Sequence, residues 1–568
     1  AYTYDDKTDT YNVVPGGGNQ NPWRERRKRN VIDRFAQLQM TYNKQFGVHG
    51  LSAVAAYERY DTDNKYLVVH TVPPNNYIPL MSFANQDLLI DEWNVTARAG
   101  YIGRVNYNYK QRYLIEALGR YDGSFLFAPG RRYGFFPGAS LGWRISEEPF
   151  FKNGAGNVVS ELKLRASYGR TGSDLINDNF IVAPYSYLSG YNFLQGSAIF
   201  NGNYNIGVRP RGLPITTLSW VTNVTSNIGL DFGLLNGKLT GQFDAFERRR
   251  SGLPAAQYDV LLPSEVGYTL PPANLNSDAI RGLEGALSYS SKVGELTYTV
   301  GVNATLARLR SLEVYKPRFG NSLDEYRNSP VDRWSNINWG YQVAGRFQSQ
   351  QEIDDHKIDN DGQGNRTQLP GDFIYKDVNG DGLITNLDER PIGYAEGATP
   401  YVNYAFNTTL GYRGFTLQVD VVGAGLQTFR REVEQKIPFQ NNGTSPNYIL
   451  EDRWHRADPF NADSPWVPGT YPPIRKDNPS HVNYSRRSDF WVTNVRYLRL
   501  RNLEVGYNIP KALLSKVGIS AMKVYVNGTN LISFDNLKAI GVDPEISSNG
   551  ALVYPPQRLF NTGFALSF

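Results

Sequence analysis

The sequence contains no cysteine, three methionines and five histidines among its 568 residues. Without cysteine it has no disulfide framework, no thiolate metal site and no cysteine nucleophile. The five histidines are scattered and show no metal-ligand or metalloprotease spacing (His49, His70, His356, His455 and His481). No nucleophile-elbow, Walker A or dinucleotide-binding glycine pattern leads from a strand into a helix. The sequence therefore predicts a protein that is not an enzyme and has neither catalytic residues nor a cofactor-binding motif.

Long apolar runs are also missing. No stretch of about 18 apolar residues occurs, which excludes a membrane-spanning helix, and the mean hydropathy is −0.45. A membrane β-barrel remains compatible, because its strands alternate lipid-facing and lumen-facing residues and average to modest hydropathy. The formal net charge of +5 is a weak argument for nucleic acid, and we predict no nucleic-acid partner. The chain begins AYTYDD, without Met or a signal peptide, so we expect a fragment or a processed chain.

What the sequence has is period-two alternation over stretches of 10 to 15 residues, longer than a typical soluble strand. In FAQLQMTYN, the residues Ala36, Leu38, Met40 and Tyr42 share one face, and the polar residues between them share the other. About ten residues is the length of a tilted strand that crosses a bilayer. Tyrosines at strand ends suit the aromatic girdles of membrane barrels. A soluble sandwich also alternates, so the alternation alone does not decide between the two.

The lengths of the connections favour a membrane barrel over a soluble sandwich. Very short turns alternate with long loops, as in membrane barrels, whereas a sandwich would not alternate short and long loops in this way. The predicted strands are 33–43, 48–60, 97–109, 112–121, 136–146, 160–171, 221–234, 238–250, 278–290, 294–309, 399–412, 415–430, 490–507, 519–532 and 557–568. The predicted long loops are 61–96, 172–220, 251–277, 310–398, 431–489 and 533–556. The fold class is thus all-β, an antiparallel transmembrane barrel.

The last strand orients this barrel. In RLFNTGFALSF, the residues Phe560, Phe564, Leu566 and the terminal Phe568 lie on one face, which resembles the signal read by outer-membrane assembly machinery. A last strand of any sheet is the plainer interpretation. With the C-terminal strand entering the periplasm, the long loops are extracellular and the protein lies in the outer membrane of a Gram-negative bacterium. About 15 strands and a stub at Tyr2–Tyr4 are counted, whereas bacterial barrels have even strand numbers, so further sequence or a partner chain is expected.

Several long blocks, in order along the chain, resemble the SusC/RagA family of TonB-dependent outer-membrane transporters from Bacteroidetes. The blocks are GRYDGSFLFAPGRRYGFFPGASLGWRISEEPFFK, LKLRASYGRTGSD, NIGLDFGLLNGKLTGQFDAFERR, GRFQSQQEID, PGDFIYKDVNGDGLITNLDERPIG, FWVTNVRYLRLRNLEVGYNIPKALL and VYVNGTNLISF. The resemblance runs from about residue 33 to Phe568.

The resemblance implies a 22-stranded barrel with an N-terminal plug domain and a TonB box, of which the plug, the box and about seven strands are absent from residues 1–568. It further implies import of oligomeric glycans or peptides, a SusD-like surface lipoprotein as lid, and energy from the TonB complex, reached through the missing N-terminal segment. Two alternatives stay open: a TonB-dependent receptor for siderophores or cobalamin, and a non-transporting scaffold or adhesin.

One stretch of the loop 310–398, YKDVNGDGLITNLD, matches a calcium loop. Such a loop supplies oxygens from positions 1, 3, 5, 7, 9 and 12 and has glycine at 6. Here the ligand positions fall on Asp377, Asn379, Asp381, Leu383, Thr385 and Asp388, with Gly382 at the turn. We expect a structural Ca²⁺ that fixes a long extracellular loop. The alternative is an Asx-rich turn that hydrogen-bonds its own backbone. The nearby acidic segment 354–365 fits no template and is interpreted as a solvated turn.

Two further features have a functional and a plain interpretation. The aromatic residues Trp334, Trp339 and Tyr341 are candidates for stacking on a substrate, although loop packing against a lid protein gives the same pattern. The basic run Arg24–Arg29 is assigned to the first extracellular loop, either as solvated charge or as a contact to outer-membrane lipid, in particular lipopolysaccharide phosphate.

Overall fold

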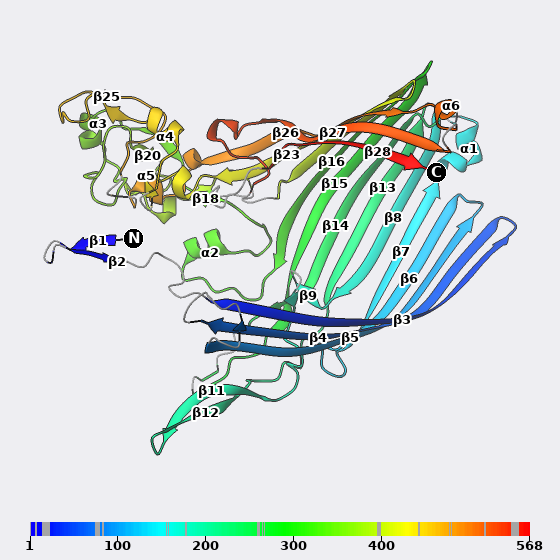
Figure 1. Cartoon of the computed structure of the whole chain (residues 1–568), viewed down its shortest axis with the longest axis horizontal. Coiled ribbons are helices and arrows are strands. Elements are labelled where there is room, and N and C mark those ends of the chain that lie inside the picture. The colour runs from blue at the N-terminus through cyan, green and yellow to red at the C-terminus, as the bar shows by residue number, and fades with distance from the viewer. Residues whose placement is uncertain are drawn as a thin grey trace.

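The computed structural model describes the chain apart from residues 1, 6–7, 9, 14–22, 74–79, 82–84, 155, 157, 177–178, 258–261, 264, 266, 395–398, 441–442, 476–477, 479, 516–517 and 547–555. One antiparallel sheet dominates the described residues, in the order β28-β27-β26-β23-β22-β16-β15-β14-β13-β8-β7-β6-β5-β4-β3. This order follows the chain, and Figure 1 shows the strands side by side as one curved wall with β3 and β28 at its two edges. The all-β, antiparallel prediction is confirmed.

The wall consists of 15 long strands, which agrees with the predicted number. They are β3 (Arg24–Phe46), β4 (His49–Val72), β5 (Asn85–Tyr109), β6 (Tyr113–Ser124), β7 (Tyr133–Arg144), β8 (Val159–Ser173), β13 (Val221–Leu234), β14 (Leu239–Ala255), β15 (Ala273–Val293), β16 (Leu296–Glu313), β22 (Val402–Tyr412), β23 (Phe415–Arg430), β26 (Val492–Asn508), β27 (Ala521–Asp535) and β28 (Leu559–Ser567). Within the described residues, β3 and β28 do not pair with each other, so the wall is open at both edges.

Short strands and helices occupy the connections. The short strands are β1 (Tyr2–Asp5), β2 (Thr10–Val13), β9 (Leu175–Ile176), β10 (Asn179–Phe180), β11 (Tyr191–Phe200), β12 (Asn203–Pro210), β17 (Arg333–Trp334), β18 (Trp339–Gly340), β19 (Val343–Arg346), β20 (Phe373–Tyr375), β21 (Arg390–Pro391), β24 (His455–Arg456) and β25 (Trp466–Val467). The helices are α1 (Pro149–Lys152), α2 (Ser322–Asn328), α3 (Gln350–Asp355), α4 (Asn447–Glu451), α5 (Val482–Ser485) and α6 (Lys511–Leu514). In the part of the chain that the structure describes, 3-10 turns occur at Ile145–Glu147, Asn386–Asp388, Val433–Gln435, Asp489–Trp491 and Lys538–Ile540. No described helix has the length and apolar content needed to cross a membrane.

Connection lengths alternate as predicted except around β7, where the connection 125–132 is shorter than the α1 connection 145–158. The tight turns 47–48, 110–112, 235–238, 294–295 and 413–414, together with the α1 and α6 connections, share one end of the wall. The long connections all emerge at the other end, and Figure 1 shows α1, α6 and the C-terminus on the right, opposite the long connections.

The strand boundaries were wrong in one region. The predicted loop 61–96 is largely strand, because β4 runs to Val72 and β5 begins at Asn85. The basic run Arg24–Arg29 likewise lies in β3, where it pairs with the end of β4, and not in a loop. Backbone hydrogen bonds pair these extensions whatever their side chains are. Because charged residues interrupt the alternation of apolar and polar side chains, the alternation did not predict these parts of the strands.

The two faces of the wall differ in chemistry. Register across β8, β13, β14, β15 and β16 places Leu164, Leu230, Phe243, Gly285 and Ala304 in one row. The same register places Lys163, Asp231, Gln242, Ala286 and Asn303 in a row on the opposite face. We call these the apolar face and the polar face. A face of exposed large apolar side chains beside a polar face is the arrangement of membrane barrels.

The main buried core lies outside the wall. The described residues of 341–394 and 431–491 fold together, at the upper left of Figure 1, into a unit that we call the loop body. Its core is a cluster of mostly aromatic side chains: Tyr341, Phe373, Tyr375, Ile384, Ile449, Tyr471, Tyr484 and Trp491. A smaller cluster of Phe429, Val495, Leu537 and Val542 joins the ends of two wall strands, β23 and β26, to the last long connection.

Candidate functional site: the polar face and the loop body

The polar face is crossed by ion pairs that join neighbouring strands. The Arg165 guanidinium donates to Asp231 Oδ1 at 2.9 Å and to both oxygens of Asp244 at 2.5 and 2.6 Å. This side chain lies across Gly229, where an added Cβ would be 2.5 Å from Arg165 Cζ. Because Gly229 has no side chain, the Arg165 guanidinium can extend over it to Asp244 in β14. Lys163 contacts Asp231 at 3.4 Å, so two cations and two carboxylates alternate over three strands.

A second network lies nearer to the long-connection end of the polar face. Arg98 binds Asp174 through two hydrogen bonds of 2.8 and 3.0 Å, and Ser124 Oγ donates to the same carboxylate at 2.7 Å. Arg120 bridges Glu58 and Asp122. These paired charges give the polar face both donors and acceptors along the strands, which suits the surface of a path for polar solutes.

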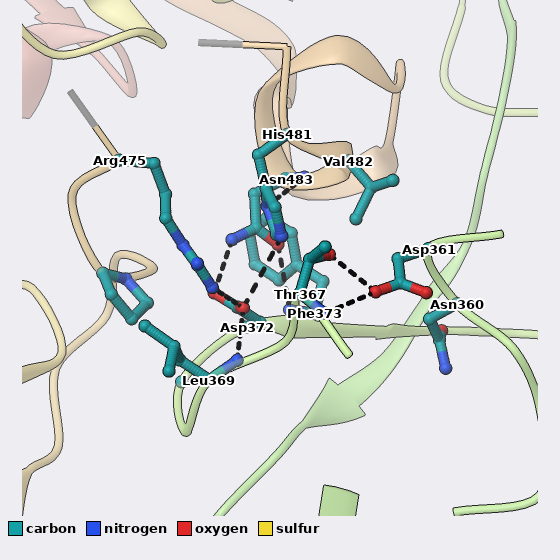
Figure 2. Close-up of polar contacts among 12 residues, drawn as sticks. Asn360, Asp361, Thr367, Leu369, Asp372, Phe373, Arg475, His481, Val482 and Asn483 are labelled. Carbon is teal, nitrogen blue, oxygen red and sulfur yellow. Dashed lines mark hydrogen bonds and ion pairs between the residues drawn. The ribbon is translucent and has the colours of Figure 1, made fainter. Parts of the chain in front are cut away.

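The loop body is held by a buried carboxylate, Asp372, whose side chain has no exposed area. Figure 2 shows Arg475, Asn483 and Leu369 directed at it from separate segments. Asn483 Nδ2 donates to Asp372 Oδ1 at 2.7 Å, and the Leu369 amide donates to Oδ2 at 2.7 Å. The Arg475 guanidinium forms an ion pair with Oδ2, and His481 Nε2 lies 3.8 Å from the same oxygen. The cluster ties β20 to α5, which are more than 100 residues apart in the chain.

Burial shifts the acid–base properties of this cluster. Desolvation raises the pKa of Asp372 to about 6, although the Arg475 charge opposes the shift. Desolvation lowers the pKa of His481 to about 4, and the nearby Arg475 charge adds to the effect. Both groups are nearly inaccessible to water, so the charged form of each is disfavoured unless it is paired.

Arginine side chains stack through the aromatic core of the loop body. Arg486 lies 5.1 Å from the Tyr341 ring and 5.0 Å from the Tyr375 ring, and it donates to the Ile384 carbonyl at 2.8 Å. Arg346 lies between the rings of Phe373 and Phe490 at 4.8 and 4.9 Å. Such contacts stabilise a partly desolvated guanidinium.

The predicted calcium loop forms a closed turn in which its own backbone amides donate hydrogen bonds to its carboxylates. Asp377 accepts from the amides of Gly380 and Gly382 at 2.7 and 2.9 Å. Asp388 is 1% exposed, and its two oxygens accept from the amides of Val378 and Thr385, each at 2.8 Å.

The remaining ligand positions show the same pattern. Asp381 accepts from the Leu383 amide at 2.9 Å and from Asn379 Nδ2 at 2.8 Å. Among the described residues, no group of three or more His, Cys, Asp or Glu side chains is arranged around a common metal position. The Asx-turn alternative explains these contacts, and the Ca²⁺ site stays a prediction.

The acidic segment 354–365 was wrongly interpreted as a solvated turn. Asn360 is fully buried, and Asn365 is 5% exposed. Asp359 forms a parallel bridge with Leu383, with hydrogen bonds Asp359 N to Gly382 O of 2.8 Å and Ile384 N to Asp359 O of 3.0 Å. The two Asp-rich turns thus pack against each other as one unit of the loop body.

The three candidate substrate aromatics are not brought together. Tyr341 is 9% exposed and lies in the loop-body core. Trp339 contacts Tyr326 edge-on, with ring centroids 5.3 Å apart. Trp334 pairs with Arg310 of β16 and lies 4.7 Å from the Arg308 guanidinium. Each therefore has a packing role, and substrate contact stays a prediction.

The polar-face networks and the Asp372 cluster were missed by sequence reasoning. Arg165, Asp231 and Asp244 each lie at a polar position of a predicted strand, so the alternation marked them as polar-face residues without revealing the register. Asp372 and Arg475 carry no local signal, because their pairing depends on two long connections folding together.

The chain is similar in sequence to known TonB-dependent receptors. A TonB-dependent receptor, P3 of Formosa agariphila, is 26% identical over 568 aligned positions, which cover 95% of the chain and 53% of the relative. The TonB-dependent receptor SusC of Bacteroides thetaiotaomicron is 28% identical over 489 positions, covering 82% of the chain and 43% of the relative. The chain spans about half the length of the curated relatives it matches. No protein-family model matches the chain.

Solved structures give the same result for the fold. The RagAB peptide importer in its open-open state matches with a TM-score of 0.71 at 19% identity, over 96% of this chain and 56% of that one. The fold is that of a TonB-dependent transporter barrel. In sequence the chain is similar to SusC, and in fold it is similar to the RagAB importer. The relatives are receptors of an outer-membrane class, and their names agree with the prediction that the chain is not an enzyme.

Proposed function

We propose that the protein containing this chain is an outer-membrane nutrient importer of the SusC type. It takes up oligomeric glycans or peptides with a SusD-like surface lipoprotein, and TonB supplies the energy. The observation that carries the proposal is the two-faced wall of 15 antiparallel strands, with ion-pair networks on one face and large apolar side chains on the other. The similarity to SusC and to the RagAB peptide importer supports the transport role.

In this proposal the apolar face meets lipid and the polar face lines the lumen. Because the chain spans about half of its relatives, the strands that close the barrel, the plug and the TonB box are assigned to the rest of the protein. The paired charges of Arg165, Asp231 and Asp244 then face the plug or the solute path. Polar oligomers are the substrates that such a lining favours.

The proposal also gives the wall its orientation. The tight turns face the periplasm, and the long connections with the loop body face the cell exterior. Short periplasmic turns and longer outer loops are the pattern of bacterial barrels. The loop body has its own buried aromatic core and so offers a rigid seat for a lipoprotein lid at the mouth of the barrel.

Deletion and purification together test the function. We expect that deleting the full gene abolishes growth on oligomeric glycans or oligopeptides while growth on their monomers continues. Affinity purification of the full-length protein is expected to recover a surface lipoprotein, and removing the TonB box is expected to abolish uptake without loss of the barrel. Loss of iron-chelate or cobalamin uptake alone would identify a receptor of a different substrate class. Normal uptake of every nutrient class would contradict import.

A further inference from the structure

The apolar face carries a groove around the middle of the wall strands. It has a volume of about 830 Å³ and is lined mainly by apolar side chains, among them Leu141, Tyr168, Ile228, Leu283, Leu306 and Trp334. The proposed solute path does not use this groove, because it lies on the other side of the sheet.

The strand register explains the groove. Ala166, Ile228, Ala245, Leu283 and Leu306 lie side by side in one row across five strands. The two alanines sit between larger neighbours and leave the surface hollow at their positions. The row of Leu164, Leu230, Phe243, Gly285 and Ala304, one step closer to the tight turns, is also apolar.

Towards the long connections, the rows change abruptly to arginine. The next row holds Tyr168, Ser226, Glu247, Arg281 and Arg308, and the one after it holds Arg170, Val224, Arg249, Ala279 and Arg310. The apolar groove therefore ends at a band with five arginines on the same face of the sheet. We call this band the arginine rim.

The arginine rim carries more positive than negative charge. Arg281 is paired with Glu247, Arg249 with Glu313 at 3.3 Å, and Arg310 with Asp332 at 2.8 Å. Five arginines against three carboxylates leave a surplus of two positive charges. Within the described residues, the two arginines at opposite sides of the rim, Arg170 and Arg308, have no carboxylate partner.

Aromatic rings fix one of these free charges at the mouth of the groove. The Arg308 guanidinium lies 4.7 Å from the Trp334 ring and 4.7 Å from the Tyr401 ring. Its Nε is buried and has no hydrogen-bond partner among the described residues. Stacking between two rings limits the rotamers of a long side chain and leaves its outer N–H groups available for an anion.

We infer that the groove and the arginine rim together bind the phosphorylated, acylated lipid of the outer leaflet, the lipid A part of lipopolysaccharide. An acyl chain lies in the apolar groove, one phosphate of the headgroup meets Arg308, and the second phosphate lies towards Arg170, which is four strands away. This inference rests on the proposed function, which places the apolar face in the membrane and the long connections outside. Basic clusters at a membrane boundary attract anionic headgroups, and arginine matches the geometry of phosphate.

The charge pattern also favours lipid over a second copy of the chain. A two-fold contact centred on this groove repeats the same patch on both subunits, so the surplus positive charge of each rim adds to the charge buried in the interface. A phosphate instead neutralises that surplus. The occupant is therefore a single anionic lipid rather than another barrel wall.

The test uses the full-length protein in nanodiscs and native mass spectrometry. The probes are lipid A, its dephosphorylated form and phosphatidylethanolamine. The variant is the double substitution Arg170→Gln with Arg308→Gln. The control is Arg413→Gln, which removes an exposed arginine at a tight turn, at the opposite end of the same wall.

We expect the wild type and the control to retain lipid A about 30-fold more strongly than its dephosphorylated form, as expected for two rim arginines near the surface. The double variant is expected to lose this preference while uptake stays normal. Equal retention of all probes by the wild type would overturn the inference, and so would an unchanged preference in the double variant. A shift in oligomeric state without a change in lipid retention would assign the groove to a second copy. Loss of barrel insertion or of uptake in the wild-type protein would instead count against the proposed function.

Discussion

Replacing Asp372 by alanine is expected to open the loop body locally. The substitution removes two hydrogen bonds of 2.7 Å to a charged acceptor and leaves the Arg475 guanidinium, whose side chain is 15% exposed, without its partner. Removing one member of a buried pair typically costs about 3–5 kcal/mol. At about 1.4 kcal/mol per tenfold, the local opening constant should rise roughly 100- to 4,000-fold.

Hydrogen exchange of the full-length protein measures this opening directly. The Phe373 amide donates to Asn483 Oδ1 at 3.2 Å, and the Tyr375 amide donates to Asn360 Oδ1 at 2.8 Å, so peptides covering β20 report on the cluster. Loss of protection should be confined to the loop body, because the wall strands hold one another through their own ladders. Thermal unfolding of the whole barrel would not detect it.

A nearby exposed carboxylate provides the control. Asp354 lies on α3 and accepts one hydrogen bond of 3.0 Å from Gln350 in the same helix. Its replacement by alanine should change local stability by no more than about 0.5 kcal/mol. If both substitutions change the protection of β20 equally, or if neither does, then Asp372 does not hold the loop body together.

Three further predictions concern the loop body. Replacing His481 by Gln should remove about 3 kcal/mol of the stability that the loop body loses in acid. Because folding lowers the pKa of His481 to about 4, this histidine stabilises the loop body above pH 6.5, and that contribution is lost as the pH falls. Asp372, whose pKa is raised to about 6, contributes in the opposite sense. Exchange of β20 peptides between pH 4 and 6.5, corrected for intrinsic rates, checks this, and equal pH profiles for variant and wild type would refute it. Replacing Tyr341 by Ala should cost about 3 kcal/mol of loop-body stability; lost uptake with unchanged exchange would show a substrate contact instead. If the Asp-rich loop binds Ca²⁺, the metal should protect residues 377–388 in the wild type but not in Asp377→Ala, whereas no effect of Ca²⁺ or chelator on either protein leaves only the Asx turn.

The strands of the wall could be predicted because each one records its two faces in its own alternation. Phe243 and Asp244 are neighbours in the sequence and lie on opposite faces, whatever the rest of the chain does. The connection lengths added the order of the strands. Register was not predictable in this way, because it depends on partners in other strands, and neither the Arg165 network nor the arginine rim is visible without it.

The loop body was less predictable for a physical reason. Its core joins residues such as Tyr341 and Trp491, which come from different long connections. No local periodicity in the sequence predicts such a contact. The turn at Asp377 was recognised from its spacing, since its contacts are local. Its packing against Asp359 was missed because that contact is a backbone bridge between two turns that each look solvated on their own.

Scanning one strand with single cysteines tests the central account most directly. The chain has no cysteine of its own, so spin labels can be placed singly at Gln242, Phe243, Asp244 and Ala245 of β14 in the full-length protein in membranes. We expect labels at 243 and 245 to be accessible to oxygen dissolved in lipid, and labels at 242 and 244 to a water-soluble nickel chelate. Accessibility without a period of two, or with the opposite phase, would contradict a membrane wall with a polar lumen.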